Sequence, residues 1–278
     1  MCIRDRTNDE FKSRIVRQHP LTDSKFFNRF TCRNDLMHCM DHHGVYGVIF
    51  GSVCMYLIYN DGCPSLGASE TARLETINHR LTAFYKENPG ITSRLDQLTM
   101  KMLSPSGKDD YAALGGPTVK AASTRQAMPS LTELALRHLA DTNNMDHVII
   151  HQLIRHTLEF IRPSYVSGRF FTTEEIAAID QATRGVGKYM QLLRNRAKKA
   201  KQLLWHITPK THFMQHFPQE ARLISPRMVQ CYIEESYIGK IAQIWASSKN
   251  GPYREVIQYF AILKYLVLSL IHISEPTR

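Results

Sequence analysis

The chain has 278 residues, a formal net charge of +10 at pH 7, and 43% hydrophobic residues. That apolar fraction supplies a buried core, which excludes a disordered tail or a fibrous protein. The longest apolar run is shorter than the roughly 20 residues of a membrane span, and the cysteine spacing forms no disulfide framework. We therefore expect a nuclear or cytoplasmic protein that is not secreted, has no membrane partner, and binds an acidic partner such as DNA.

Both ends of the chain are interpreted as translated sequencing adapter. Residues 1–6 (MCIRDR) and residues 268–278 (LSLIHISEPTR) are what a transposon-based adapter encodes when it is read in frame from opposite directions. Such segments are excluded from reasoning about the fold. We expect the remaining segment, residues 7–267, to be a basic piece of a longer protein.

The first half of the chain predicts a linker followed by helices. Residues 7–34 are polar and aperiodic, and are interpreted as a linker or as the end of a missing core. A mainly helical region then covers residues 35–267, beginning with one long helix over 35–59, where glycines at positions 44, 47 and 51 suit close helix packing. Ser69 caps the next helix, and a short helix begins at Thr92.

The second half predicts further helices after a loop over residues 104–122, which is rich in Gly, Pro and Ser. Ser130 and Glu133 form a capping box, and an amphipathic helix after Asp146 is closed by Pro163. A second capping box begins a helix over 174–204. Pro209 and Pro218 break the segments that follow, Pro226 starts the last long helix, and a final helix covers residues 253–267. No segment shows the alternation of a strand, so the predicted fold class is mainly α, with about eight helices.

The first candidate pair is Asp35 and His38, which share a helix face at spacing i, i+3. The carboxylate and the imidazole can bind a divalent ion together, or the carboxylate can orient the ring. A helix-start Asp beside a packed His is the structural alternative. The following triplet, residues 41–43, spells a phosphoesterase signature, but it lies in a helical run and is interpreted as a chance match.

The second candidate pair is His212 and His216, at the i, i+4 spacing of metal ligands. A zinc protease would need Glu after the first His, where this chain has Phe213. A structural role for both rings stays open.

The third candidate is Glu235, which follows Glu234 in an otherwise apolar helical stretch. A carboxylate that faces inward there needs a cation or a metal, because an unpaired buried charge is costly. Gly239 permits a close approach, and Lys240 offers a phosphate contact. The alternative is one solvated and one buried Glu.

Taken in order, these motifs resemble the back half of CACTA-type (En/Spm-like) DDE transposases. In that family an Asp-x-x-His motif follows the second catalytic Asp of an RNase H-like core, and a long helical insertion comes next. The third acid lies in a motif like Tyr-Pro-Ile-Glu-Arg-Tyr-Leu-Gly-Lys. The resemblance runs from Asp35 to roughly Trp245.

The resemblance assigns a role to each matched position. Asp35 and His38 take the Asp-x-x-His positions, and Glu235 takes that of the third, metal-binding acid. The family's His pair corresponds to His212 and His216. The chain departs from the motif at Ser236, which replaces a basic residue, and at Tyr232-Ile233-Glu234, which replaces Tyr-Pro-Ile.

The function implied by the resemblance is Mg²⁺-dependent DNA cleavage and strand transfer. Two Mg²⁺ ions about 4 Å apart activate the attacking oxygen and stabilise the leaving one, and carboxylates hold them. The first two acids would precede Thr7, so this fragment is expected to be inactive and to expose an apolar surface near Asp35 and Glu235. The expected phosphate contacts are Arg194, Arg196, Lys198, Lys199, Lys201, Lys210 and Lys240; the alternative for the run 194–201 is a solvated basic face.

Two other functions remain open from the sequence. One is a non-enzymatic α-helical module that binds nucleic acid or another protein, including a second copy of itself. The other is an all-α metal-dependent phosphohydrolase built from the Asp35–His38 pair and the His212–His216 pair. The phosphohydrolase requires those side chains within about 5 Å of one another.

Overall fold

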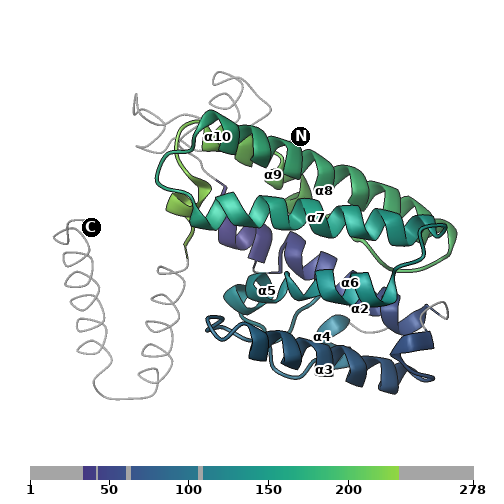
Figure 1. Ribbon diagram of the computed structural model, residues 1–278. Coiled ribbons are helices and arrows are strands. Elements are labelled where there is room, and N and C mark those ends of the chain that lie inside the picture. The colour runs from purple at the N-terminus through teal and green to yellow at the C-terminus, as the bar shows by residue number, and fades with distance from the viewer. Residues whose placement is uncertain (1–33, 42, 61–63, 106–108, 232–278) are drawn as a thin grey trace, which may run out of the picture. The chain divides into compact units, whose positions relative to one another are not determined.

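The computed structural model describes residues 34–41, 43–60, 64–105 and 109–231 (Figure 1). This part is mainly helical and contains no strand, which confirms the all-α character. Contacts divide the chain into Met1–Gln230 and Cys231–Arg278. All the described helices lie in the first unit. Three are short non-α helices: the π-helix η3 (Met37–Asp41) and the 3₁₀ turns η4 (Pro64–Leu66) and η5 (Pro226–Val229). The α-helices are α2 (Val45–Tyr59), α3 (Glu70–Glu87), α4 (Met100–Leu103), α5 (Ala121–Ala127), α6 (Ser130–His138), α7 (Met145–Val166), α8 (Thr173–Lys199), α9 (Pro209–Met214) and α10 (Phe217–Ala221).

The central element is α2, which is buried on every side from Val45 to Ile58. A helix that is apolar all round belongs in an interior rather than on a surface. Helices α3, α4, α5 and α6 and the turn η3 all pack against it. The long α7–α8 pair lies along one side of this group and α3 along the other (Figure 1).

The helix expected over residues 35–59 is broken between η3 and α2. His43 has a φ of +46°, a left-handed conformation that a right-handed helix cannot include. Gly44 follows, and a Cβ there would lie 2.4 Å from the carbonyl oxygen of Cys39. The chain therefore turns sharply at residues 43–44 and starts α2 in a new direction.

The glycines of α2 do allow a close approach, but their partner is an extended segment rather than a helix. The backbone N–H of Leu114 donates to the carbonyl of Gly47 at 2.7 Å. A Cβ on Gly51 would lie 2.6 Å from the Cα of Ala113. The predicted loop over residues 104–122 thus sends residues 112–114 along the glycine face of α2.

The longest helix pair is α7 with α8, and a predicted capping box begins α8. The N–H of Glu175 donates to Thr172 Oγ1 at 3.2 Å, and the N–H of Thr172 donates to Glu175 Oε2 at 2.8 Å. Bonds from the Ser167 side chain and the Thr172 backbone lower the pKa of Glu175. Near the middle of the pair, Gly185 leaves room for the His156 ring, which lies 2.4 Å from where a Cβ would sit.

Several predicted helix boundaries are wrong. Pro163 does not close α7, which continues for one turn to Val166. Ser130 is the first residue of α6 rather than its cap, and its hydroxyl donates to the Ala127 carbonyl at 2.7 Å. The short helix begins at Met100 after a Thr99 cap rather than at Thr92, and α8 ends at Lys199 rather than at residue 204.

Loss of the α8 cap should have a measurable effect on stability. Replacing Thr172 with Ala removes the acceptor for the Glu175 N–H, and we expect the free energy of unfolding to fall by about 1 kcal/mol. Urea unfolding followed by circular dichroism measures this change. Thr173→Ala, one residue later, is the matched control and should change stability by less than about 0.5 kcal/mol; equal losses would argue against the cap.

The hydropathy of the helices tests the expectation that the chain has no membrane-spanning segment. Within residues 34–231, the described part of the chain, no helix is long and apolar enough to cross a membrane. The long helix expected to start at Pro226 does not start there, because Pro226–Val229 is a 3₁₀ turn and Gln230 is extended. The rest of that segment, the helix expected over 253–267, the segment 7–33 and both adapter-like ends lie outside the described residues.

Candidate functional site

The Asp35 and His38 side chains are in direct contact at the start of η3. The Asp35 Oδ2 and the His38 Nδ1 form a short hydrogen bond, and the Oδ1 accepts the N–H of Met37 at 3.0 Å. Both side chains are partly exposed, at 24% and 37%. The Asp35 carboxylate therefore orients the His38 ring and also caps the turn. The functional and the structural interpretation of the pair are both compatible with this geometry.

The rings of His212 and His216 also meet, at the end of α9. Their Nε2 atoms are 3.2 Å apart and the ring planes are nearly perpendicular, at 88°. His216 is buried and His212 is exposed. One buried and one open imidazole at this separation can share a proton or a metal ion.

The fold brings these two pairs to neighbouring elements, because η3 packs against α9. Asn34 fastens the contact: its backbone N–H donates to Glu220 Oε1 and its side-chain amide to the Phe213 carbonyl, both at 3.3 Å. The described residues nevertheless contain no group of metal-ligating atoms that includes both pairs. The two pairs therefore form no shared ligand group among these residues, and the all-α phosphohydrolase stays a prediction.

A buried polar cluster that the sequence analysis did not find lies between η3, α5 and α7. The carboxylate of Asp41 accepts from Arg125 Nη1 at 3.0 Å and from the Tyr165 hydroxyl at 3.0 and 2.9 Å. The Arg125 guanidinium also lies 4.0 Å from the centroid of the Tyr165 ring. Asp41, which belongs to the phosphoesterase-like triplet, thus has a structural role in joining three elements.

The basic run at the end of α8 divides into two groups. Arg196 forms an ion pair with Asp146 at the start of α7. Arg194 lies over the ring of Tyr111, with its guanidinium 5.3 Å from the centroid, and Tyr111 stacks on His206 at 4.3 Å. These two arginines therefore help to hold the end of α8 in place.

The electrostatics around this stack are consistent with a structural role. Burial is the main cause that lowers the pKa of His206, and the positive charge of Arg194 lowers it further. His206 is therefore more readily neutral, which suits a ring that stacks on Tyr111 near the positive charge of Arg194.

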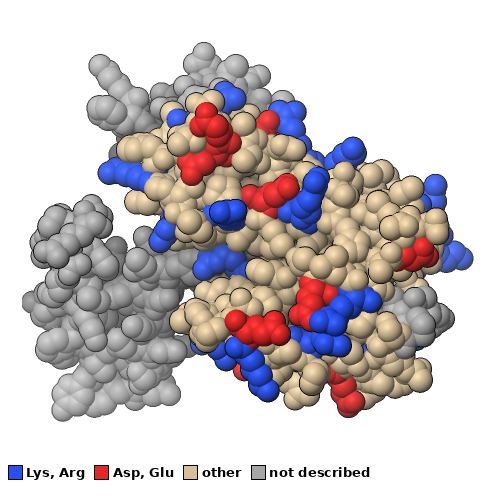
Figure 2. Space-filling model, viewed as in Figure 1, with Lys and Arg blue, Asp and Glu red and all other residues tan. Residues whose placement is uncertain are grey.

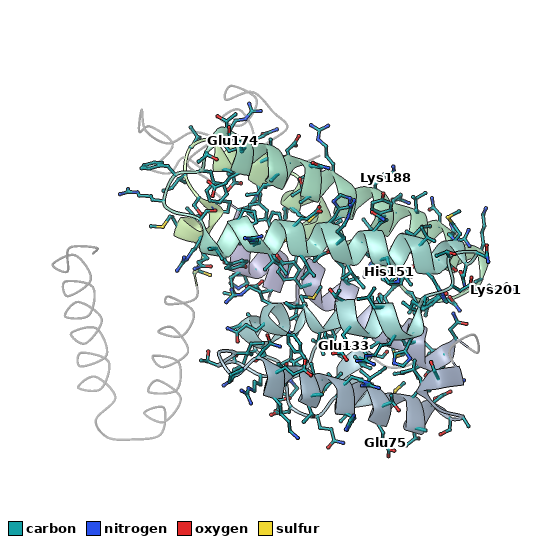
Figure 3. All side chains as sticks on the ribbon, viewed as in Figure 1. Glu75, Glu133, His151, Glu174, Lys188 and Lys201 are labelled. Carbon is teal, nitrogen blue, oxygen red and sulfur yellow. The ribbon has the colours of Figure 1, made fainter. Side chains whose placement is uncertain are left out.

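The second group consists of Lys198, Lys199 and Lys201, which are all exposed. None of the ion pairs among the described residues includes them. Figure 3 shows Lys201 at the far end of α8 from Glu174, with Lys188 between them. Across the face drawn in Figure 2, Lys and Arg side chains are scattered among acidic ones, so charge alone does not mark one surface there.

Lys210 lies apart from that group, near η3. Its ammonium donates to the carbonyl of His43 at 3.1 Å. Burial lowers the pKa of Lys210, while the nearby Cys39 and Asp35 groups act in the opposite direction. The residue ties α9 to the break before α2, and is a weaker candidate for a phosphate contact than the exposed lysines.

The described residues do not by themselves fit a magnesium site. Mg²⁺ prefers several oxygen ligands, whereas the candidates here are one carboxylate that already contacts an imidazole and a pair of imidazoles. Glu235 and Lys240 lie outside the described residues, so their assignments stay predictions.

Exposed apolar side chains gather where α7 ends and η5 begins. Val166 is 76% exposed and Phe170 is 68% exposed, while Leu223 and Met228 are each about half exposed. Their segments are joined by the Ser225 N–H, which donates to the Arg169 carbonyl at 2.9 Å. Tyr165, next to Val166, bonds to η3, so this apolar surface and the Asp35–His38 pair flank the same end of α7.

Comparisons with protein-family models, with curated proteins and with solved structures found no match to this chain.

Proposed function

We propose that the chain is a nucleic-acid-binding helical segment of a transposase-like protein, and that the end of α8 contacts phosphates. The observation that carries this proposal is the group formed by Lys198, Lys199 and Lys201. The three ammonium groups are exposed within four residues and belong to no ion pair among the described residues. The net charge of +10 also makes the long-range electrostatic field of the protein positive, which attracts the negatively charged phosphates.

The expected interaction is electrostatic attraction between the lysine ammonium groups and the DNA phosphates. A lysine that neutralises a phosphate releases a condensed counterion, and this release is favourable at low salt. The three lysines also lie at the helix C-terminus, where the macrodipole favours positive charge. The interaction with the macrodipole needs no hydrogen bond from the ammonium groups, so their N–H groups can still donate to phosphate oxygens.

The contacts of the other basic residues support assigning the phosphate contacts to the three lysines. Arg194 and Arg196 already contact Tyr111 and Asp146, and Lys210 donates to a backbone carbonyl. In this proposal they shape and hold the surface, while the exposed lysines make the phosphate contacts.

The catalytic part of the transposase hypothesis depends on Glu235 and on two acids that would precede Thr7. Binding by the lysines needs no metal, and we expect it to persist in EDTA and in a Glu235→Ala variant. This separates the binding function from the ancestral cleavage and strand transfer.

The test is fluorescence anisotropy of the full chain with a labelled DNA duplex over a range of salt concentrations. We expect the slope of log affinity against log salt to flatten by about 0.9 for each lysine that contacts a phosphate. The combined variant K198A/K199A/K201A should therefore bind about tenfold or more weakly at low salt.

A matched control removes the same charge elsewhere. Lys86, Lys101 and Lys120 are exposed on other elements, and their combined alanine variant should retain most of the affinity. Equal losses in the two triple variants would show that only net charge matters and would overturn the assigned interface. An unmodified chain without salt-dependent binding would overturn the proposed function.

A further inference from the structure

We infer that His212 and His216 form a binding site for a divalent transition-metal ion such as Zn²⁺. Their Nε2 atoms are 3.2 Å apart. Zinc binds imidazole nitrogen at about 2.0–2.1 Å in tetrahedral geometry, which places two nitrogen ligands about 3.3 Å apart. The two nitrogens therefore already have the separation that one bound ion requires.

The packing of α9 and α10 holds this separation. Pro209 and the Thr208–Thr211 cap start α9, and the N–H of His216 donates to the Phe213 carbonyl at 3.0 Å. Around the pair, Met214 and Phe217 are fully buried. The backbone next to His216 is therefore hydrogen-bonded and packed, which keeps the two Nε2 atoms close together.

Without metal, the same geometry suits a hydrogen bond between two neutral rings, in which one Nε2–H donates to the other Nε2. To bind a metal ion, the ring with the Nε2–H takes its Nδ1–H tautomer, so that the Nε2 lone pair of each ring is available to the ion. Because His212 is exposed, an ion can reach its nitrogen from solvent, while the buried His216 provides the fixed ligand.

The donor set selects the class of metal. Imidazole suits Zn²⁺, Ni²⁺ and Cu²⁺, whereas Mg²⁺ favours oxygen ligands. Among the described residues no third His, Cys, Asp or Glu atom joins this cluster, so in this part of the chain water would complete the coordination. Binding is then weaker than at a closed four-ligand site, and open positions remain for a further ligand.

The chain contains its own control for helical His spacing. His147 and His151 are also four residues apart, on α7. The Nε2 of His151 lies 3.0 Å from the Leu139 carbonyl, and His147 meets the ring of Tyr56 edge-on, with the centroids 6.1 Å apart. The same spacing here places the two rings against different neighbours, so this pair should bind no ion.

The experiment is a titration of the full chain with ZnCl₂ and NiCl₂, followed by calorimetry. His212→Ala removes an exposed ligand without opening the core, and we expect metal affinity to fall at least tenfold. His151→Ala should leave metal affinity unchanged. Circular dichroism of each variant confirms that the fold is retained.

Nuclear magnetic resonance of the imidazole nitrogens gives a second measurement that does not depend on any substitution. Adding Zn²⁺ should shift the Nε2 signals of His212 and His216 together, at the same metal concentration. A chain whose His212→Ala variant binds metal as tightly as the original, or whose two Nε2 signals stay unmoved, would overturn the inference. Neither result affects the lysine interface, because DNA binding is measured in EDTA.

Discussion

Replacing Arg125 with Met is expected to lower the free energy of unfolding by about 3–5 kcal/mol, the cost of breaking a buried ion pair. The Asp41 side chain has no exposed surface, and its carboxylate lies 3.0 Å from Arg125 Nη1. The substitution leaves the buried carboxylate with the Tyr165 hydroxyl but without the guanidinium. It also removes the contact between the guanidinium and the Tyr165 ring.

Urea unfolding followed by circular dichroism measures the loss, and an exposed ion pair supplies the control. Arg137 contacts Glu133 at 2.8 Å on the surface of α6, with half of its side chain exposed. Arg137→Met should cost no more than about 0.5–1 kcal/mol. If both substitutions cost the same, the buried cluster does not join η3, α5 and α7 as described.

A double variant separates the charge from the loss of packing. Asp41→Asn together with Arg125→Met removes both charges of the pair, so no carboxylate that has lost the Arg125 guanidinium remains in the interior. We expect the double variant to be more stable than Arg125→Met alone. A double variant that is less stable than the single one would show that burial of the charge is not the main cause.

Local patterns predicted much of the fold. The Ser69 cap predicted the start of α3, and the long apolar run predicted the buried α2 within the helix expected over residues 35–59. The capping box at Thr172 and Glu175 predicted the start of α8, and its two hydrogen bonds are both present. These features depend on residues within one or two helical turns, so the sequence alone carries them.

Boundaries set by long-range packing were not predictable in the same way. The break before α2 depends on a left-handed residue at His43, a residue type that gives no such signal by itself. Pro163 has no N–H to donate, yet α7 continues past it because packing against α8 outweighs the local preference. The spacing of the glycines indicated a close approach but not which segment would approach.

In the candidate site, too, contacts within one helical turn were predictable and contacts between distant elements were not. The contacts Asp35–His38 and His212–His216 follow from helical spacing and were predicted as pairs. Their arrival on neighbouring elements, through Asn34 and Phe213, joins residues 179 apart in the chain. No pattern within a single element contains that information.

The buried cluster and the basic run were harder to interpret from the sequence. Asp41 bonds to Tyr165, 124 positions later, so no local pattern in the sequence indicated its partner. The sequence offered no reason to distinguish the five cations of the run 194–201. In the structure Arg194 and Arg196 contact other side chains, whereas the three lysines are exposed. The resemblance to DDE transposases depends most on Glu235, which stays a prediction.

The fit between α2 and the segment 112–114 leads to the second large effect on stability, which we expect from Gly51→Ala. The new Cβ would lie 2.6 Å from the Cα and carbonyl carbon of Ala113 and from the N of Leu114. These are backbone atoms and cannot rotate away, so α2 or the segment must shift. We expect the free energy of unfolding to fall by about 2 kcal/mol, because overpacking costs exceed the gain of about 1 kcal/mol in helix propensity.

The control for Gly51→Ala is another glycine within a helix. A Cβ on Gly187 of α8 would meet only the end of the Gln215 side chain, at 3.0 Å. Because that flexible side chain can move aside, Gly187→Ala should be neutral or stabilising by up to about 1 kcal/mol. Thermal unfolding of both variants compares the same chemical change in two environments, and a stabilised Gly51→Ala would show that the loop does not pack on the glycine face of α2.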